Sequence, residues 1–306
     1  METIHTPVLS VPILDANGNK LFSFRPQFYK FLQRCKTKIN TEDTQVLGIL
    51  WGGVGCGKSV LAQKIAYTIT NKLSLDKIAF SKNEFIQAVL VSEREVIIAD
   101  EGIAIFFGRG AMTKEGRLMA ELMAQIRVKN LFVLICVPDI LSIDAMVLAQ
   151  ANFIAHVYES REIHNNKLRI IKGNVNVYPD MAHYSFKDNI IRWLKLKRSN
   201  PMYREKKPPF YCRQKGDIYH KDQKDGGFYA VDKDAYITKK LSVFDKYKKE
   251  IEKTERKRLR GKKEYDYLAI DNDLANGLSK DDVRRKYKIS QSQLYTYLRN
   301  KAKGLV

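Results

Sequence analysis

A glycine-rich run followed by a lysine and a serine is the part of the sequence best suited to chemistry. It reads Gly52, Gly53, Val54, Gly55, Cys56, Gly57, Lys58, Ser59 and Val60. Glycines let consecutive backbone N–H groups turn inward around phosphate oxygens, and a helix starting at the end of the loop presents further donors. Lys58 would reach the β- and γ-phosphates, and the Ser59 hydroxyl would bind Mg²⁺. The pattern therefore predicts a P-loop for ATP and Mg²⁺, with an ordinary glycine-rich turn as the weaker alternative.

Two carboxylates follow a second apolar run. Val96 to Ala99 leads directly into Asp100 and Glu101, and ligands of open α/β sheets bind at the carboxyl ends of the strands. Asp100 would hold Mg²⁺, directly or through water, and Glu101 is the candidate general base for the attacking water. A solvated turn would explain this pair in isolation. Because Asp100 lies 42 positions after Lys58, the two motifs together predict ATP hydrolysis, with Lys58 and Glu101 as the catalytic residues.

The elements that must position these residues alternate along the chain. Apolar runs predict strands over residues 46–51, 77–80, 95–99, 131–137 and 153–158. Helical patterns predict helices over 58–71, 83–91, 112–128 and 140–150. Such alternation is typical of an α/β fold, here a P-loop NTPase with a parallel sheet flanked by helices. A hairpin over 8–24 and a helix over 26–39 are expected to precede it.

A glutamate directly after the Mg²⁺-binding aspartate resembles the RecA-like and AAA+ ATPases, over residues 45–160. Within that segment, Glu84-Phe85-Ile86 and the stretch from Gln125 to Pro138 are similar to phage and mobile-element ATPases of the FtsK/HerA and Zot-like type. That resemblance implies a DNA translocase or packaging motor that forms a homo-oligomer such as a ring. It also implies an arginine finger from a neighbouring subunit. The candidate fingers, each also explained as a surface arginine, are Arg109, Arg117, Arg127 and Arg161.

The strand after the catalytic glutamate departs from that family. A polar residue that senses the γ-phosphate usually ends this strand, whereas Val137-Pro138-Asp139 stands here. Cys136 and Asp139 are the candidate sensors, unless sensing is absent.

The positive charge lies in the second half of the chain. The net charge is +20, and residues 156–306 hold 37 Lys and Arg against 20 Asp and Glu, whereas residues 1–155 hold 17 against 14. This asymmetry favours a polyanionic partner, most often nucleic acid, over a basic surface that only serves solubility. Aromatic residues between 203 and 236 alternate with basic ones, which single-strand stacking or, more simply, a small β module would explain.

The last residues predict three helices, over 265–276, 280–287 and 291–300, in a helix-turn-helix arrangement that resembles the DNA-binding domains of resolvases. The expected core is Leu274, Leu278, Val283, Tyr287, Ile289, Leu294 and Leu298. Residues expected to enter the major groove are Gln291, Ser292, Gln293, Tyr295 and Thr296, and candidate phosphate contacts include Arg284, Arg285, Lys288 and Arg299. Two positions depart from the family, since Arg284 replaces a small residue and Lys288 replaces a turn glycine. A three-helix protein-interaction domain is the alternative.

Five segments follow from these patterns. They are an N-terminal hairpin and helix (1–44), the ATPase core (45–160), a β-rich basic and aromatic extension (161–237), a basic helix or linker (238–263) and the helix-turn-helix (264–306). Four scattered cysteines and the lack of a long apolar run or signal segment predict a soluble, cytoplasmic protein without a membrane partner. The expected function is an oligomeric ATP-hydrolysing motor on duplex or single-stranded DNA. The alternatives are an AAA+ replication initiator or helicase loader, and a non-motor ATP-switched DNA-binding regulator or partition factor.

Overall fold

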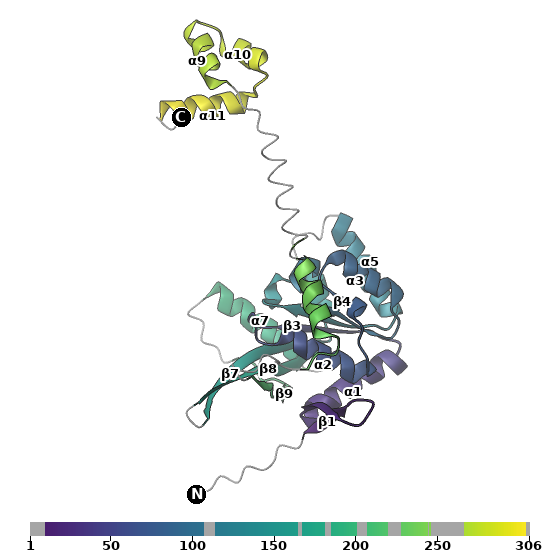
Figure 1. The fold of residues 1–306 in the computed structure, drawn as a ribbon. Helices are drawn as coiled ribbons and strands as arrows, with labels where there is room; N and C mark the ends of the chain where they lie inside the picture. The colour runs from purple at the N-terminus through teal and green to yellow at the C-terminus, as the bar shows by residue number, and fades with distance from the viewer. Residues whose placement is uncertain are drawn as a thin grey trace. The chain divides into compact units, whose positions relative to one another are not determined.

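The computed structural model describes residues 10–106, 114–164, 167–180, 185–200, 207–219, 228–243, 245 and 266–303 (Figure 1). The chain divides into two compact units, Met1–Val243 and Phe244–Val306, and each is described by itself.

A central, mostly parallel sheet forms the first unit. Its parallel strands are β7 (Phe153–His164), β3 (Val46–Trp51), β6 (Phe132–Val137), β5 (Val96–Ala99) and β4 (Ile78–Ala79), which neighbour one another in that order. Strand β3 is buried except for a half-buried Trp51, as expected of a strand covered on both faces. The predicted parallel α/β sheet is confirmed.

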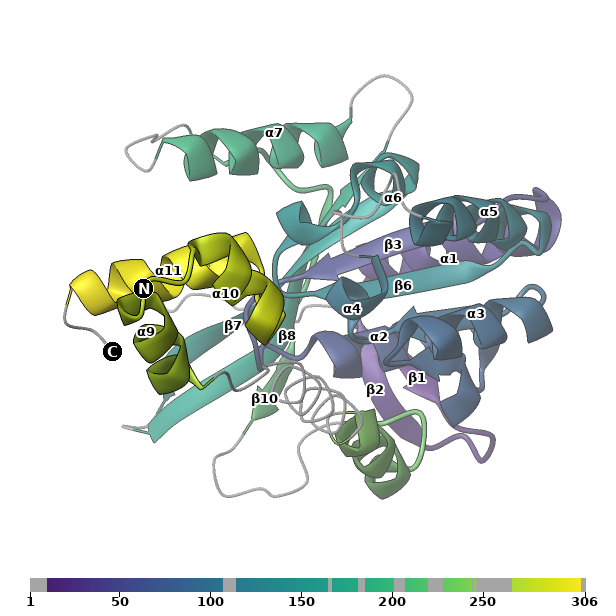
Figure 2. The ribbon, with the colours of Figure 1, turned by 90° about the horizontal axis from the view of Figure 1, so that it is seen from above.

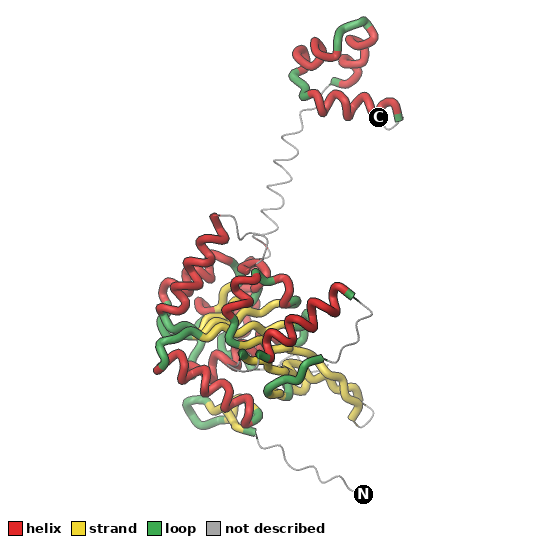
Figure 3. Tube along the Cα trace, turned by 180° about the vertical axis from the view of Figure 1, so that it is seen from behind, coloured by secondary structure: helices red, strands yellow, loops and turns green. Residues whose placement is uncertain are grey.

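Helices cover both faces of this sheet, as Figure 3 shows. Side chains of β3 alternate between the two cores, since Leu50 packs on one face and Ile49 on the other. One face carries α1 (Pro26–Thr41), α2 (Lys58–Thr70) and a helix over residues 233–243. The other carries α3 (Lys82–Val91), α4 (Gly102–Phe106), α5 (Lys114–Val128), α6 (Ala145–Gln150) and α7 (Phe186–Ser199).

The single helix predicted over 140–150 is wrong. A short 3₁₀ helix, η2 (Ile140–Ser142), comes first, and α6 begins separately at Ala145. Each start has its own aspartate cap, because the Asp139 carboxylate accepts from the Leu141 amide and the Asp144 carboxylate accepts from the Met146 amide. Two caps five residues apart therefore divide the segment.

Antiparallel strands extend the sheet beyond β7. Strand β8 (Lys167–Pro179) pairs with β7, and β9 (Cys212–Gln214) and β10 (Asp217–Tyr219) pair with β8. The β7–β8 pair projects from the rest of the sheet in both ribbon views (Figures 1 and 2). The described strands of the predicted 161–237 extension thus belong to the central sheet.

The N-terminal hairpin packs against the first unit. Strands β1 (Val11–Leu14) and β2 (Lys20–Phe24) are antiparallel, as predicted. Phe22 and Phe24 lie in the same core as α1 and α2. The hairpin therefore supports the helix that follows the P-loop.

The second unit contains three helices, α9 (Tyr267–Ala275), α10 (Lys280–Tyr287) and α11 (Gln291–Ala302). The Ser279 and Ser290 side chains cap the starts of α10 and α11. The predicted core is wrong at Leu278, which is 37% exposed, because Ile270 and Tyr297 fill the centre instead. Lys288, at the expected glycine position, has a φ of +52°, a conformation that glycine adopts more easily.

Within the described ranges, no helix combines the length and apolar character needed to cross a membrane. The four cysteines are free and buried.

Candidate nucleotide site

The glycine-rich loop connects β3 to α2 and is braced by strands of the same sheet. A Cβ on Gly52 would lie 1.9 Å from the Val157 carbonyl oxygen of β7, so only glycine fits there. Gly57 has a φ of +99° immediately before α2. The Gly173 amide of β8 donates to the Cys56 carbonyl at 2.8 Å. The β7–β8 pair therefore holds the loop from one side.

Lys58 and Ser59 begin α2, at the positions the sequence predicted. The Lys58 ammonium donates to the carbonyls of Gly52 at 2.9 Å and Gly53 at 2.8 Å, so it folds back over its own loop. The Ser59 hydroxyl donates to Asp100 Oδ1 at 2.5 Å. The structure thus joins the two predicted motifs directly.

Asp100 and Glu101 follow β5, two strands away from β3 in the sheet. The Asp100 side chain is 1% exposed, whereas that of Glu101 is 42% exposed. The Asp100 amide donates to the Ala79 carbonyl at the end of β4, which fixes the start of the turn. One carboxylate is therefore buried beside Ser59, and the other can meet water.

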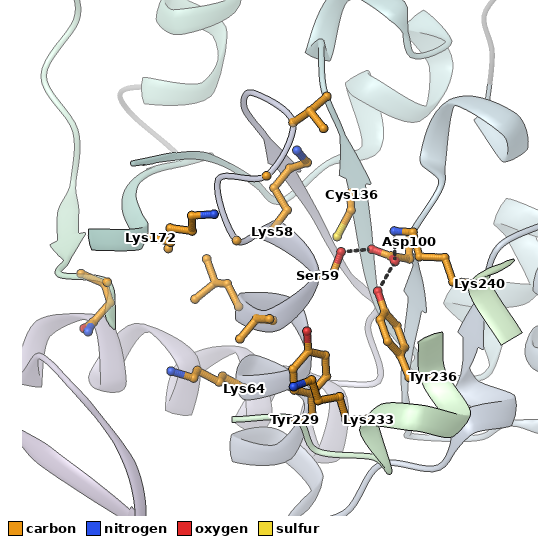
Figure 4. A pocket seen from close by; sticks show the side chains of 18 of the residues that line it. Lys58, Ser59, Lys64, Asp100, Cys136, Lys172, Tyr229, Lys233, Tyr236 and Lys240 are labelled. Carbon is orange, nitrogen blue, oxygen red and sulfur yellow. Dashed lines mark hydrogen bonds and ion pairs between the residues drawn. The ribbon is translucent and has the colours of Figure 1, made fainter. Parts of the chain in front are cut away.

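A helix that the sequence did not assign to the site completes this corner. Tyr236 donates its hydroxyl to Asp100 Oδ2 at 2.5 Å. The Lys240 ammonium lies 3.0 Å from Asp100 Oδ2 and 3.2 Å from Glu101 Oε1 (Figure 4). Both side chains come from the helix over 233–243, of which residues 238–243, with Lys240, fall within the predicted basic helix or linker. Their four-residue spacing places them on one helix face, but nothing local in the sequence identifies Asp100 as their partner.

Burial and charge fix the protonation of this helix's polar groups. Burial is the main cause that raises the pKa of the Tyr236 hydroxyl, and the Asp100 carboxylate reinforces it. Burial alone would lower the pKa of Lys240, but Asp100 and Glu101 outweigh it, so the pKa is raised. Lys240 therefore stays cationic and Tyr236 stays a hydrogen-bond donor at neutral pH.

A cavity of about 550 Å³ surrounds the N-terminus of α2, which is the size of a small-molecule site. Among the described residues that line it, six are lysines and two are carboxylates, Asp100 and Glu101. The lysines are Lys58, Lys64, Lys172, Lys215, Lys233 and Lys240. Such an excess of positive charge suits a polyanion, and Figure 4 shows several of these lysines around the loop.

The cavity also shows which ion could bind. The Ser59 hydroxyl and the Asp100 carboxylate are hard oxygen donors, the kind that Mg²⁺ prefers. Among the described residues, no group of three or more His, Cys, Asp or Glu could hold a metal alone. Mg²⁺ is commonly held by one or two protein groups together with phosphate oxygens and water, so the donor set fits a nucleotide-bound Mg²⁺.

The two candidate sensors differ in position. Cys136 of β6, between β3 and β5, lines the cavity and is 2% exposed. Burial raises the pKa of its thiol well above the usual value, and the Asp100 charge adds to the effect. Asp139 instead caps η2 and lies 3.6 Å from Arg198. The structure brings Cys136, as a neutral thiol, to the site and directs the Asp139 carboxylate to a structural role.

The candidate arginine fingers lie outside the described cavity lining. Arg109 falls outside the described residues, as does the side chain of Arg117. Arg127 is exposed on α5, and Arg161 is exposed on β7, where it pairs with Glu159 at 3.0 Å. Contact with the nucleotide of a neighbouring subunit stays a prediction for these residues.

In the second unit, the five predicted DNA-reading side chains, Gln291, Ser292, Gln293, Tyr295 and Thr296, are all exposed on α11. The Gln293 side chain also accepts from the Ser290 amide in a capping box. The Ser-x-x-Gln spacing could have revealed this role. Arg284 pairs with Asp281 at 2.8 Å. The remaining predicted phosphate contacts, Arg285, Lys288 and Arg299, are exposed.

Comparisons with known proteins find several solved structures that are partly similar to this chain. No protein-family model and no curated protein matches the sequence. A structure of the genome packaging NTPase B204 from Sulfolobus turreted icosahedral virus 2, in complex with ATP-gammaS, matches with 17% identity and a TM-score of 0.32, covering 44% of this chain and 92% of that one. The N-terminal domain of zonular occludens toxin from Neisseria meningitidis matches with 12% identity and a TM-score of 0.34, covering 59% and 96%.

A further match is to the HORMA:CdnC:Trip13 complex from E. coli MS115-1, with 17% identity and a TM-score of 0.30. It covers 41% of this chain and 60% of that one. Likenesses of this size do not assign the chain to any of these families. The site therefore rests on its own geometry, in which Lys58, Ser59, Asp100 and Glu101 meet in one lysine-lined cavity.

Proposed function

We propose that this chain is an ATPase that binds MgATP at the P-loop and hydrolyses it. The observation that carries the proposal is the contact between the Ser59 hydroxyl and the buried Asp100 in the lining of a lysine-rich cavity. That contact joins two motifs whose residue types suit a triphosphate and its metal.

Each residue then has a role set by its position. Lys58 would exchange the carbonyls of its own loop for phosphate oxygens, and Ser59 and Asp100 would hold the metal. Bound Mg²⁺ would offset the negative charge of the β- and γ-phosphates. Glu101 is exposed enough to orient a water and accept its proton, since its side chain is 42% exposed.

Two substitutions test these roles. Lys58→Ala should abolish ATP turnover and weaken nucleotide binding, because the loop loses its mobile cation. Glu101→Gln should leave ATP bound but uncleaved. Glu121→Gln, at an exposed position of α5, is the matched control and should hydrolyse ATP at the rate of the unmodified chain. Undiminished hydrolysis by Glu101→Gln would remove Glu101 as the base.

We further propose that hydrolysis is linked to DNA in an oligomeric motor of a virus or mobile element. The three-helix second unit, with exposed Arg285, Lys288 and Arg299, supports a DNA contact. An AAA+ initiator or helicase loader fits less well, because its α-helical lid would follow the core, where β8, β9 and β10 lie.

A non-motor ATP switch is the second candidate. The contact of Lys240 with both Asp100 and Glu101 favours it, because a site held closed between turnovers suits slow, timed hydrolysis. The ATPase rate should be measured with and without duplex and single-stranded DNA, together with the mass of the particle. Strong stimulation and a ring support the motor, whereas nucleotide-dependent DNA affinity with little stimulation supports the switch.

A further inference from the structure

The helix over residues 233–243 contributes Lys233 and Lys240 to the lining of the cavity. The roles proposed above give it no direct phosphate contact, yet it contacts both carboxylates of the site. Lys240 lies within 3.2 Å of Asp100 and Glu101, and Tyr236 donates to Asp100. Figure 4 shows the two side chains reaching the corner from the same helix. The helix therefore occupies the side of the cavity where the metal would bind.

A second lysine holds the helix in place from a different direction. The Lys239 ammonium donates to the carbonyls of Leu75 at 2.9 Å and Ile78 at 2.6 Å, beside β4. It also lies 3.6 Å from Glu84 at the start of α3. Lys239 thus seats the helix without touching Asp100 or Glu101.

Asp100 accepts three hydrogen bonds in this arrangement, out of about four that a carboxylate can accept. Oδ1 accepts from Ser59, and Oδ2 accepts from both Tyr236 and Lys240. Mg²⁺ demands near-ideal octahedral oxygen ligands at about 2.0–2.1 Å. A divalent ion held by Ser59 and Asp100 would share this carboxylate with the Lys240 ammonium, and two positive charges at such short range repel.

From this conflict we propose that the helix over 233–243 covers Asp100 and Glu101 when Mg²⁺-nucleotide is absent, and that it is displaced when Mg²⁺-nucleotide binds. We call this helix the latch, and we call it seated when it contacts the two carboxylates. The proposal rests on the proposed ATP site.

Hydrogen exchange of the full chain tests the displacement. With Mg²⁺ and a slowly hydrolysed ATP analogue, amides of residues 233–243 should exchange at least about tenfold faster than in the free chain, while P-loop amides should exchange more slowly. The analogue with EDTA should leave residues 233–243 unchanged. Slower exchange of this helix with Mg²⁺ and analogue would overturn the latch and make the helix part of the bound state.

Affinity measurements with variants give a second readout. Lys240→Ala should bind the Mg²⁺-analogue complex more tightly, by about tenfold if the latch is seated about nine-tenths of the time. Lys239→Ala should do the same, because it loosens the helix without removing a charge from the carboxylates. Lys30→Ala, at an exposed position of α1, removes the same charge elsewhere and should bind as the unmodified chain does.

The outcomes separate the latch from the ATP site. Weaker binding of the analogue by Lys240→Ala would make Lys240 a phosphate ligand. Tighter binding by Lys240→Ala, with unchanged binding by Lys239→Ala, would mean that the Lys240 charge alone opposes the metal and that the helix is not displaced. Either result overturns the latch while the ATP site stands. No analogue binding by the unmodified chain or by either variant would overturn both proposals.

Discussion

At the scale of single residues, the approach of Gly52 to β7 decides whether the P-loop can form. A Cβ at this position would meet the Val157 carbonyl oxygen at 1.9 Å, whereas a Cβ on Gly53 would meet nothing within 4 Å. Because that oxygen belongs to the backbone of a central strand, it cannot move aside as a flexible side chain would.

Gly52→Ala is therefore expected to lower the free energy of unfolding by about 1–3 kcal/mol, the range of overpacking in a core. Gly53→Ala serves as the matched control and should change it by less than about 0.5 kcal/mol. Urea unfolding of both variants measures the difference. Equal values for the two variants would contradict the close approach at Gly52.

His156 gives the first unit a dependence on pH. Its ring stacks on Trp51 with centroids 4.1 Å apart, and its Nδ1 lies 3.1 Å from the Lys207 ammonium. Burial, and then the charge of Lys207, lower the pKa of His156 from 6.5 to about 4. The neutral ring accepts a hydrogen bond from Lys207, so protonation would place two cations together.

The unfolded chain therefore binds a proton on His156 near pH 6.5, and the folded chain only near pH 4. Its contribution to stability is full above about pH 6.5 and is lost as the pH falls toward 4. His156→Gln keeps an acceptor but does not titrate, so its melting temperature should fall less between pH 7.5 and 5, on the order of a few degrees. Parallel melting curves for the two chains would contradict the lowered pKa.

At the scale of elements, the sequence predicted what depends on local pattern. Alternating apolar runs located β3, β5 and β6, and the glycine spacing located the start of α2, because period and turn chemistry act over a few neighbours. The Asp139 and Asp144 caps were also local signals, and reading them would have divided the 140–150 helix. The capping role of Gln293 could likewise have been found from its distance to Ser290.

The contact of Tyr236 with Asp100 could not be predicted in this way. The two residues are 136 positions apart, and their meeting depends on how a whole helix packs on the core beside α2. The sequence predicted that this region is basic. It could not show which lysines pair with carboxylates and which face solvent or DNA, because the residue type is the same in each case. The contacts around Asp100 therefore follow from tertiary packing and not from local sequence.

Helix α7 depends on one buried lysine. Lys187 is 3% exposed, and its ammonium donates to the carbonyls of Ala151 at 2.8 Å and Ala149 at 3.2 Å and pairs with Asp180 at 3.1 Å. Those two carbonyls lie at the end of α6, where the last carbonyls of a helix lack partners within the helix. Lys187 thus ties α7 to α6.

Lys187→Met keeps the length of the side chain but removes its donors, and should lower the free energy of unfolding by about 1–3 kcal/mol. Lys195→Met, on the exposed side of α7, is the control and should have an effect below about 0.5 kcal/mol. Chemical unfolding measures both. An effect of Lys195→Met as large as that of Lys187→Met would show that the tie to α6 is not what stabilises α7.

At the scale of the whole molecule, positively charged residues occur both around the cavity of the first unit and in the second unit. Inside the first unit, lysines gather at the cavity. In the second unit, residues 266–303 carry eight Lys and Arg against five Asp and Glu, and three of the cations are already paired with aspartates. Arg285, Lys288 and Arg299 are exposed, so they are better placed than Arg284 to neutralise phosphates.

Replacing Arg285, Lys288 and Arg299 together by alanine should weaken duplex DNA binding and make the slope of log affinity against log salt shallower by about 2–3, since each phosphate contact contributes about 0.9. Replacing Lys30, Lys38 and Lys195, three exposed lysines of the first unit, removes the same charge and should change the slope by less than about 1.

Deleting residues 264–306 should lower the affinity at least as far as the first set of substitutions does. An unchanged affinity and slope after the deletion would mean that the three helices bind a protein and that the DNA contact lies elsewhere. Equal effects of the two triple variants would show that DNA senses only total charge, because a docked surface distinguishes cations that touch phosphates from those that do not.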